Sequence, residues 1–293
     1  MQVRLKAKLL SAVERLTEAN VPSPRMNAEL LLMFTLGCER AYLYAHPERN
    51  LTSDETARYD ATLSERSRGV PAQYITGHQE FWGMDLIVTP AVLIPRPETE
   101  HVVETVLELV HIKTAGGEER SPQATPLRIV DVGTGSGSIA LALAKELPQA
   151  EIHATDISLA ALEIAHTNAA RHQLQSCVHF HHGDLLAGFQ DDSFDLVVSN
   201  PPYVGESEED QVQLEVRKSE PRSAVFAGRS GTEVIARLIP QSGSALRIGG
   251  WLVMEISGTI VEGTRSLLNG WKDIRIVKDL QGIPRVIAAR KKT

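Results

Sequence analysis

The residues with the clearest potential for chemistry are Asn200, Pro201, Pro202 and Tyr203, which follow the apolar run FDLVVS. Two consecutive prolines end a strand and stiffen the backbone where it leaves a sheet. Carbonyl oxygens of this loop accept hydrogen bonds, Asn200 adds a side-chain carbonyl, and Tyr203 adds a flat aromatic face. The set suits a planar NH2 group, whose two hydrogens would be accepted by Asn200 and the Pro201 carbonyl while the ring of Tyr203 packs on its π system.

An amide or ring-amino nitrogen is a weak nucleophile because its lone pair is delocalised. Holding both of its hydrogens out of line with a methyl donor orients the lone pair and offsets the positive charge that develops on nitrogen. This chemistry depends on positioning and electrostatic stabilisation, so it requires no strong general base. The alternative is that Asn-Pro-Pro forms only a turn, which is a common use of these residues.

A glycine-rich loop, Gly133-Thr134-Gly135-Ser136-Gly137, forms the second candidate site. Glycines permit a tight turn and let a ligand approach the backbone closely. The dinucleotide fingerprint requires glycine or alanine where Ser138 stands, and the Lys-Ser/Thr pair of a nucleoside-triphosphate loop is missing. Asp156 stands 19 residues after Gly137, at the end of the next apolar run, where an acid can accept from both hydroxyls of a ribose. The pattern favours an adenosine-type cofactor over a plain strand–helix turn followed by a capping aspartate.

A third loop, Gly183-Asp184-Leu185, follows the apolar-rich segment VHFHH. Asp184 can accept from the amino group of an adenine, and Leu185 can pack on the ring. Without the two preceding features, an Asx turn would be the better interpretation.

The elements that must position these loops form an alternating pattern from residue 127 onward. Short apolar runs read as strands, with helical segments between most of them: LRIVDV, EIHAT, VHFHH, FDLVVS and WLVMEI. The alternation predicts an α/β fold with a mostly parallel sheet and helices on both faces. Ligands in such folds bind beyond the carboxyl ends of the strands, where all three loops would lie.

The preceding residues look helical and then hairpin-like, so we expect three parts. These are a helical domain over 1–78, a β-hairpin linker over 79–95 and a catalytic domain over 96–293. The polar segment 113–126, rich in turn-forming residues, predicts a flexible loop.

Composition excludes several classes of protein. The chain has 293 residues with 37 acidic and 30 basic side chains, and its net charge of −7 disfavours stable binding to nucleic acid. Residues 1–69 contain ten basic and nine acidic side chains, so the other residues carry a net −8. Two cysteines are too few for a disulfide scaffold. No segment reaches the ~18 apolar residues of a membrane span, and we expect a cytoplasmic protein without membrane contact.

Cys177, His179 and His181 alternate along one segment and would share one face of a strand. That arrangement raises the possibility of zinc, but neither a carboxylate nor a second cysteine cluster accompanies it. We therefore expect no metal.

The motifs together resemble those of a known family. The glycine loop, Asp156 and the Asn-Pro-Pro-Tyr loop look like a class I, Rossmann-like S-adenosyl-L-methionine-dependent methyltransferase acting on a planar nitrogen. More narrowly, the chain resembles the PrmC/HemK family of glutamine N5-methyltransferases of peptide chain release factors. The segments that carry the resemblance span most of the chain: AQYITGHQEFWG, LIPRPETE, DVGTGSGSIA, SNPPYV and EPRSAVFAG.

The resemblance implies a role for each loop. Residues Gly133 to Gly137 would lie along the methionine part of S-adenosyl-L-methionine, and Asp156 would hold the ribose. Asp184 and Leu185 would flank the adenine, although the family often has an aromatic residue at the second position. Asn200 would touch both cofactor and substrate, and Asn200 to Tyr203 would bind the glutamine amide in the Gly-Gly-Gln loop of class 1 release factors. The catalytic residues would be Asn200, Pro201 and Tyr203.

Two other functions stay open at this point. An amino-methyltransferase acting on adenine or cytosine of nucleic acid would also use such a loop, on a flipped base. A noncatalytic cofactor-binding module would not need the polar platform of Asn200 and Tyr203. Within the favoured function, the helical domain is our candidate for recognising the protein substrate.

Overall fold

The computed structural model describes residues 3–115 and 126–292. The chain divides into two compact units. The first comprises residues up to 78 together with 213–219, and the second comprises residues 79–212 and those from 220 onward.

The first unit is helical. Its helices are α1 (Leu5–Glu18), α2 (Pro24–Leu36), α3 (Arg40–Ala45), α4 (Ser53–Ser67), α5 (Ala72–Thr76) and α9 (Leu214–Ser219). Two short strands, β1 (Val3–Arg4) and β2 (Asn50–Leu51), pair antiparallel. Apolar residues of the long helices form one buried core, with Leu16, Leu31 and Tyr59 among its fully buried side chains.

Local sequence signals account for the ends of these helices. Thr52 and Glu55 form a reciprocal capping box at the start of α4, which satisfies two backbone N–H groups that the helix cannot.

Helix α9 belongs to this unit although it is distant in sequence. Its Glu215 forms an ion pair at 2.7 Å with Arg66, a buried residue of α4.

The second unit is built on a sheet of seven strands. They are β5 (Arg128–Val132), β6 (Glu151–Asp156), β7 (Val178–His182), β8 (Phe194–Ser199), β9 (Leu246–Glu255), β10 (Lys272–Lys278) and β11 (Pro284–Arg290). Their order is β10-β11-β9-β8-β5-β6-β7. The five strands from β9 to β7 pair parallel, and β11 pairs antiparallel with both β9 and β10.

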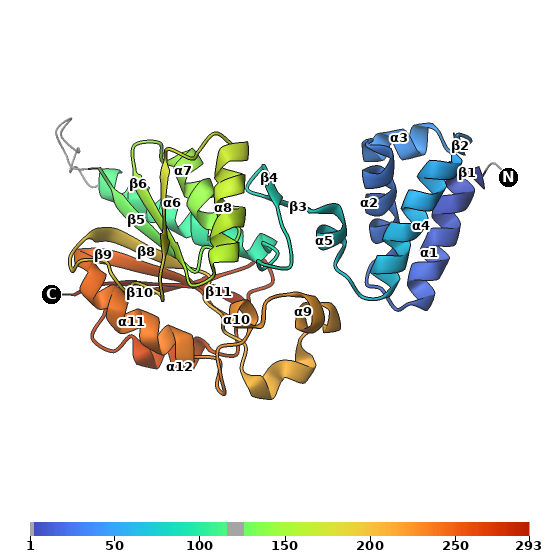
Figure 1. Cartoon of the computed structure of the whole chain (residues 1–293). Coiled ribbons are helices and arrows are strands. Elements are labelled where there is room, and N and C mark those ends of the chain that lie inside the picture. The colour runs from blue at the N-terminus through green and yellow to red at the C-terminus, as the bar shows by residue number, and fades with distance from the viewer. Residues whose placement is uncertain (1–2, 116–125, 293) are drawn as a thin grey trace. The chain divides into compact units, whose positions relative to one another are not determined.

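Helices cover both faces of this sheet (Figure 1). On one face α6 (Glu100–Ala115), α7 (Ser138–Glu146) and α8 (Leu159–Arg171) pack over a core that includes Val103, Leu141 and Ile129. On the other face α11 (Glu233–Ala245) and α12 (Val261–Leu267) enclose a second core around Leu238 and Leu252. Three short helices complete the unit: η1 (Pro97–Thr99), η2 (Glu206–Gln211) and α10 (Arg222–Val225).

The parallel pairing brings the ends of neighbouring strands to one level. Val132 of β5 lies opposite Ser199 of β8, and Ser199 lies opposite Met254 of β9. The first residues beyond these strands therefore emerge at the same edge of the sheet. Strand β5 lies between β6 and β8, so later strands are added on both of its sides. Such a switch in strand order is the point at which α/β folds bind ligands.

The five predicted strands all fall on strands of the sheet, and the α/β fold with helices on both faces is confirmed. The predicted loop over 113–126 is wrong at its start, because α6 continues to Ala115. No helix-breaking residue interrupts α6 before Gly116. Residues 116–125 of that predicted loop lie outside the described residues. No helix among the described residues is long and apolar enough to cross a membrane.

A hairpin of β3 (His78–Phe81) and β4 (Met84–Ile87) precedes the sheet, as predicted. Asn168 of α8 is fully buried and joins this hairpin to the glycine loop. Its Oδ1 accepts from Ile87 N at 2.7 Å, and its Nδ2 donates to the carbonyls of Ile87 at 3.0 Å and Ser136 at 2.9 Å. One side chain thus satisfies three backbone groups.

Replacing this side chain should be costly, because it leaves buried backbone groups without partners. We expect Asn168→Ala to lower the free energy of unfolding by about 2 kcal/mol or more in urea denaturation. Asn269→Ala serves as the matched control, since Asn269 is exposed. Equal stability of the two variants would contradict the account of Asn168.

Candidate active site

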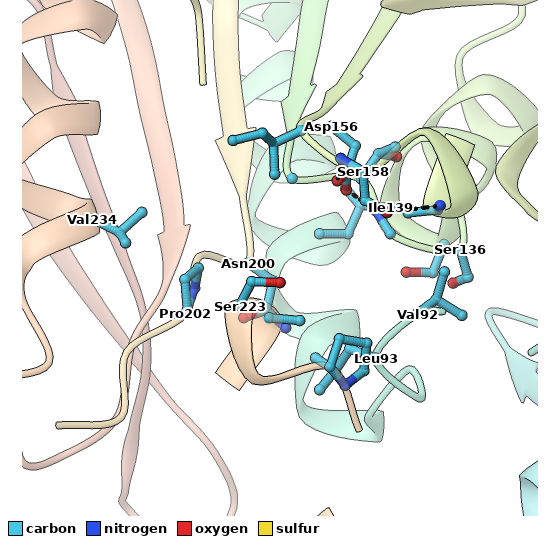
Figure 2. Close-up of a pocket in the computed structure, with 18 of the residues that line it drawn as sticks. Val92, Leu93, Ser136, Ile139, Asp156, Ser158, Asn200, Pro202, Ser223 and Val234 are labelled. Carbon is cyan, nitrogen blue, oxygen red and sulfur yellow. Dashed lines mark hydrogen bonds between the residues drawn. The ribbon is translucent and has the colours of Figure 1, made fainter. Parts of the chain in front are cut away.

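A cavity of about 360 Å³ lies at the carboxyl edge of the parallel strands of the second unit. Its walls come from the loops after β5, β6, β7 and β8, from the segment before α6, and from the chain around α10. In the view of Figure 2, Asp156 and Ser158 lie above Asn200, Pro202 and Ser223. The candidate site residues that line the cavity are Gly133, Thr134, Gly135, Ser136, Asp156, Asp184, Leu185, Asn200 and Pro202.

The glycine loop turns sharply because three of its residues adopt left-handed backbone angles. The φ values of Gly133, Gly135 and Gly137 are +72°, +56° and +84°. Gly137 also lies against α8, where an added Cβ would come within 3.3 Å of the Cβ of Ala165. It is not a wall residue itself, and it lets the helix behind the loop approach closely.

Asp156 is bound to the same loop through one carboxylate oxygen and to the backbone just beyond β6 through the other. Its Oδ2 accepts from Gly135 N and its Oδ1 accepts from Ser158 N, each at 2.9 Å. A carboxylate oxygen can accept more than one hydrogen bond, so the group retains acceptor capacity toward the cavity. The two backbone donors fix its direction before any ligand arrives.

Asp131, the last but one residue of β5, is a buried acid whose role sequence reasoning did not assign. Its Oδ2 accepts from the hydroxyl of Thr134 at 2.7 Å and from Ala140 N at 3.2 Å, while Oδ1 has no partner among the described residues. Burial raises the pKa of this carboxyl to about 7. The sequence feature that could have indicated a role for Asp131 is its position just before the glycine loop, near the end of an otherwise apolar strand.

Asp184 pairs with Arg237 of α11, another wall residue that sequence reasoning missed. Leu185 beside it has φ +55°, a backbone angle that is uncommon for a residue with a side chain. Both candidate adenine contacts lie at the cavity wall, and the aspartate is held there by its ion pair with Arg237.

Within the Asn-Pro-Pro-Tyr loop, the four residues differ in position. Asn200 and Pro202 line the cavity, Pro201 is buried, and Tyr203 lies behind the wall. Asn200 Nδ2 donates to Thr99 Oγ1 at 3.1 Å, and the Tyr203 hydroxyl donates to Glu255 Oε1 at 3.0 Å. Burial raises the pKa of Tyr203, and the Glu255 carboxylate raises it further, so the phenol stays protonated.

The chain around α10 braces this loop from outside. Val204 N donates to Val225 O at 3.1 Å, and Ala227 N donates back to Val204 O at 3.0 Å. The buried Glu220 accepts from Ile94 N and forms an ion pair with Arg96, which holds the segment before η1. The segments around Pro95 and Pro221 thus form part of the cavity wall.

His181 of β7 is engaged with His153 of β6. His181 Nε2 lies 2.9 Å from Nδ1 of His153, and His153 Nε2 lies 2.8 Å from a carboxylate oxygen of Glu151. Across the described ranges, no group of three or more histidine, cysteine or acidic side chains is arranged to hold a metal.

The site fits S-adenosyl-L-methionine by size and by chemistry. The cavity offers an oriented carboxylate at Asp156 for ribose hydroxyls and apolar side chains such as Ile139 and Leu185 for a base. Fold and site together define a class I S-adenosyl-L-methionine-dependent methyltransferase.

Comparison with known proteins narrows this class. Residues 8–77 match the family model of the PrmC N-terminal domain, and residues 119–219 match that of the methyltransferase small domain. The chain is 51% identical over 290 residues to the release factor glutamine methyltransferase of Koribacter versatilis, covering 99% of each chain. It is 40% identical to the enzyme of the same name from Coxiella burnetii, covering 92% of each. The chain belongs to the family of release factor glutamine methyltransferases.

Solved structures support the fold alone. A methyltransferase from Pyrococcus furiosus aligns with a TM-score of 0.50 at 17% identity, over 72% of this chain and 90% of the other. The hMettl16 catalytic domain, solved in complex with a MAT2A 3'UTR hairpin, aligns with a TM-score of 0.56 at 16% identity, over 84% and 86%.

The ribose contact expected of Asp156 can be tested by cofactor binding. We expect Asp156→Ala to weaken the affinity for S-adenosylhomocysteine by about tenfold or more in calorimetry, because charged hydrogen bonds are lost. The exposed Asp191, replaced by alanine, is the matched control. An affinity for the cofactor product that matches the control would argue against the contact.

Proposed function

We propose that this protein transfers a methyl group from S-adenosyl-L-methionine to the side-chain amide nitrogen of the glutamine in the Gly-Gly-Gln motif of class 1 peptide chain release factors. The observation that carries the proposal is the position of Asn200. It lines the same cavity as the glycine loop and Asp156, in a chain that belongs to the family of release factor glutamine methyltransferases.

The proposed cofactor site uses one edge of the sheet. Gly133, Thr134, Gly135, Ser136 and Gly137 would follow the methionine part, Asp156 would hold the ribose, and Asp184 with Leu185 would flank the adenine. The pairing of Asp184 with Arg237 supports an anchored aspartate at that wall. Asn200 would stand between cofactor and substrate, which its place in the wall supports.

The cofactor supplies an electrophilic methyl group on a sulfonium. The substrate nitrogen would take this methyl group as the carbon–sulfur bond breaks, S-adenosylhomocysteine would leave, and one amide hydrogen would pass to water as a proton. Asn200 Oδ1 and the Pro201 carbonyl would accept the amide hydrogens and stabilise the charge that develops on nitrogen. Pro202 and the ring of Tyr203 would complete the substrate site.

Tyr203 would act through its ring, because its hydroxyl is already committed to Glu255. The raised pKa of this phenol argues against its use as a base near neutral pH. This agrees with a mechanism that relies on positioning and needs no strong base.

We further propose that the helical unit recognises the release factor and that the protein acts in the cytoplasm. The matching PrmC N-terminal domain over residues 8–77 supports a family-specific role for that unit, and two free cysteines suit a reducing compartment. The acidic net charge argues against stable nucleic-acid binding. The hMettl16 domain shares only the fold at 16% identity, so its bound RNA does not indicate the substrate of this chain.

The role of Asn200 predicts a large kinetic effect. We expect Asn200→Ala to lower kcat for release-factor methylation by about 100-fold, since an acceptor of the developing charge is removed, while the melting temperature stays close to that of the wild type. Asn269→Ala is the control, because Asn269 is exposed and lies outside the wall. Near-normal turnover by Asn200→Ala would refute this role.

Substrate identity predicts a separate outcome. Wild-type protein with methyl-labelled cofactor should label a class 1 release factor, and should leave unlabelled the same factor with alanine in place of the Gly-Gly-Gln glutamine. Label that enters DNA or RNA, with none in the release factor, would favour the amino-methyltransferase alternative.

A further inference from the structure

A buried carboxylate lies directly behind the Asn-Pro-Pro-Tyr loop. Glu255 is the last residue of β9, which pairs with β8, and only 3% of its surface is exposed. Met254 lies opposite Ser199, so Glu255 at the end of β9 lies level with Asn200, the first residue after β8. The proposed methyl transfer does not use this carboxylate, and burying a charge is costly unless partners satisfy it.

Two hydroxyl groups from distant parts of the chain donate to Glu255. The hydroxyl of Thr99 donates to Oε2 at 2.6 Å, and that of Tyr203 donates to Oε1 at 3.0 Å. Burial raises the pKa of Glu255 and nearby Glu98 adds to that shift, while both hydroxyls and Arg285 oppose it. The carboxylate thus holds one residue of the Asn-Pro-Pro-Tyr loop directly and a second one through Thr99.

The direction of each hydrogen bond follows from the acceptor at its end. The Thr99 hydroxyl donates to Oε2 of Glu255, so its single hydrogen is committed to that carboxyl group. Thr99 Oγ1 can then only accept from Asn200, which must present Nδ2 at 3.1 Å. The carbonyl end of the Asn200 amide is consequently the end left for other partners.

We propose that Glu255 is a positioning residue that fixes, through Thr99, which end of the Asn200 amide is available to the substrate. This inference rests on the proposed function, in which Asn200 Oδ1 accepts from a substrate NH2 group. A reversed amide would present its own NH2 to that of the substrate and lose the contact. Glu255 also anchors Tyr203 through its hydroxyl, so one carboxylate holds two residues of the Asn-Pro-Pro-Tyr loop.

Thr99→Val tests the relay with little change in shape, because only the hydroxyl is replaced by a methyl group. We expect kcat for release-factor methylation to fall about tenfold or more, while the dissociation constant for S-adenosylhomocysteine changes less than about threefold. Thr99→Ser should restore most of the lost rate, since it returns the hydroxyl. Thr105→Val is the control, because Thr105 is a buried threonine whose hydroxyl donates to His101 O within α6.

Glu255→Gln tests the carboxylate itself. An amide offers one acceptor and one donor, so either Thr99 or Tyr203 must reverse its hydroxyl. We expect kcat to fall with cofactor binding preserved, since either reversal disturbs a residue that Glu255 holds. If this variant proves too unstable to assay, the threonine series still decides the question.

A spectroscopic measurement tests the orientation without any substrate. The chain has six asparagines, so asparagine-selective ¹⁵N labelling gives few side-chain amide signals, and Asn200→Ala identifies the relevant one. Thr99→Val should shift that signal and speed its hydrogen exchange, whereas Thr105→Val should leave it unchanged.

The outcomes separate this inference from the proposed function. A Thr99→Val enzyme with wild-type kcat, a loss that Thr99→Ser does not recover, or an unchanged Asn200 signal would overturn the relay. If wild-type protein transfers no methyl group to a release factor, the proposed function fails. In that case the Asn200 signal alone still supports or overturns the orientation imposed by Thr99.

Discussion

The site depends on the parallel, in-register pairing of four neighbouring strands, β9, β8, β5 and β6. This pairing places the residues that end or follow these strands in one row: Glu255, Asn200, Gly133 and Asp156. The strand order switches at β5, where successive strands are added first on one side and then on the other, and the cavity lies at this point of the row. The sheet thereby brings a glycine loop and a rigid proline loop side by side.

Buried polar side chains then hold these loops in place. Asp131 ties the glycine loop to the start of α7, Asn168 ties it to the hairpin, and Glu255 ties the Asn-Pro-Pro-Tyr loop to η1. Each of them satisfies polar groups that the loops would otherwise leave without partners, which is how a buried polar group avoids its desolvation cost. The loops are thus preorganised, as a reaction that relies on positioning requires.

The features that sequence reasoning could predict are local in the chain. The glycine loop, Asp156 and the Asn-Pro-Pro-Tyr loop each stand directly after, or at the end of, an apolar strand, and the alternation of strands and helices predicts the sheet. Thr99, Arg237 and Glu255 were not assigned individual roles, because each acts through a partner more than 50 positions away in the sequence. Helix α9 joins the helical unit for the same reason, through an ion pair with Arg66 that no local pattern encodes.

We propose that this edge of the sheet directs a methyl group to a planar amide nitrogen. The most direct test is tandem mass spectrometry of a reaction that offers a class 1 release factor and RNA to the enzyme together. We expect one added methyl group, located on the side-chain amide of the Gly-Gly-Gln glutamine, and unmodified RNA. A methyl group on another residue of the release factor, or on a nucleobase, would contradict it.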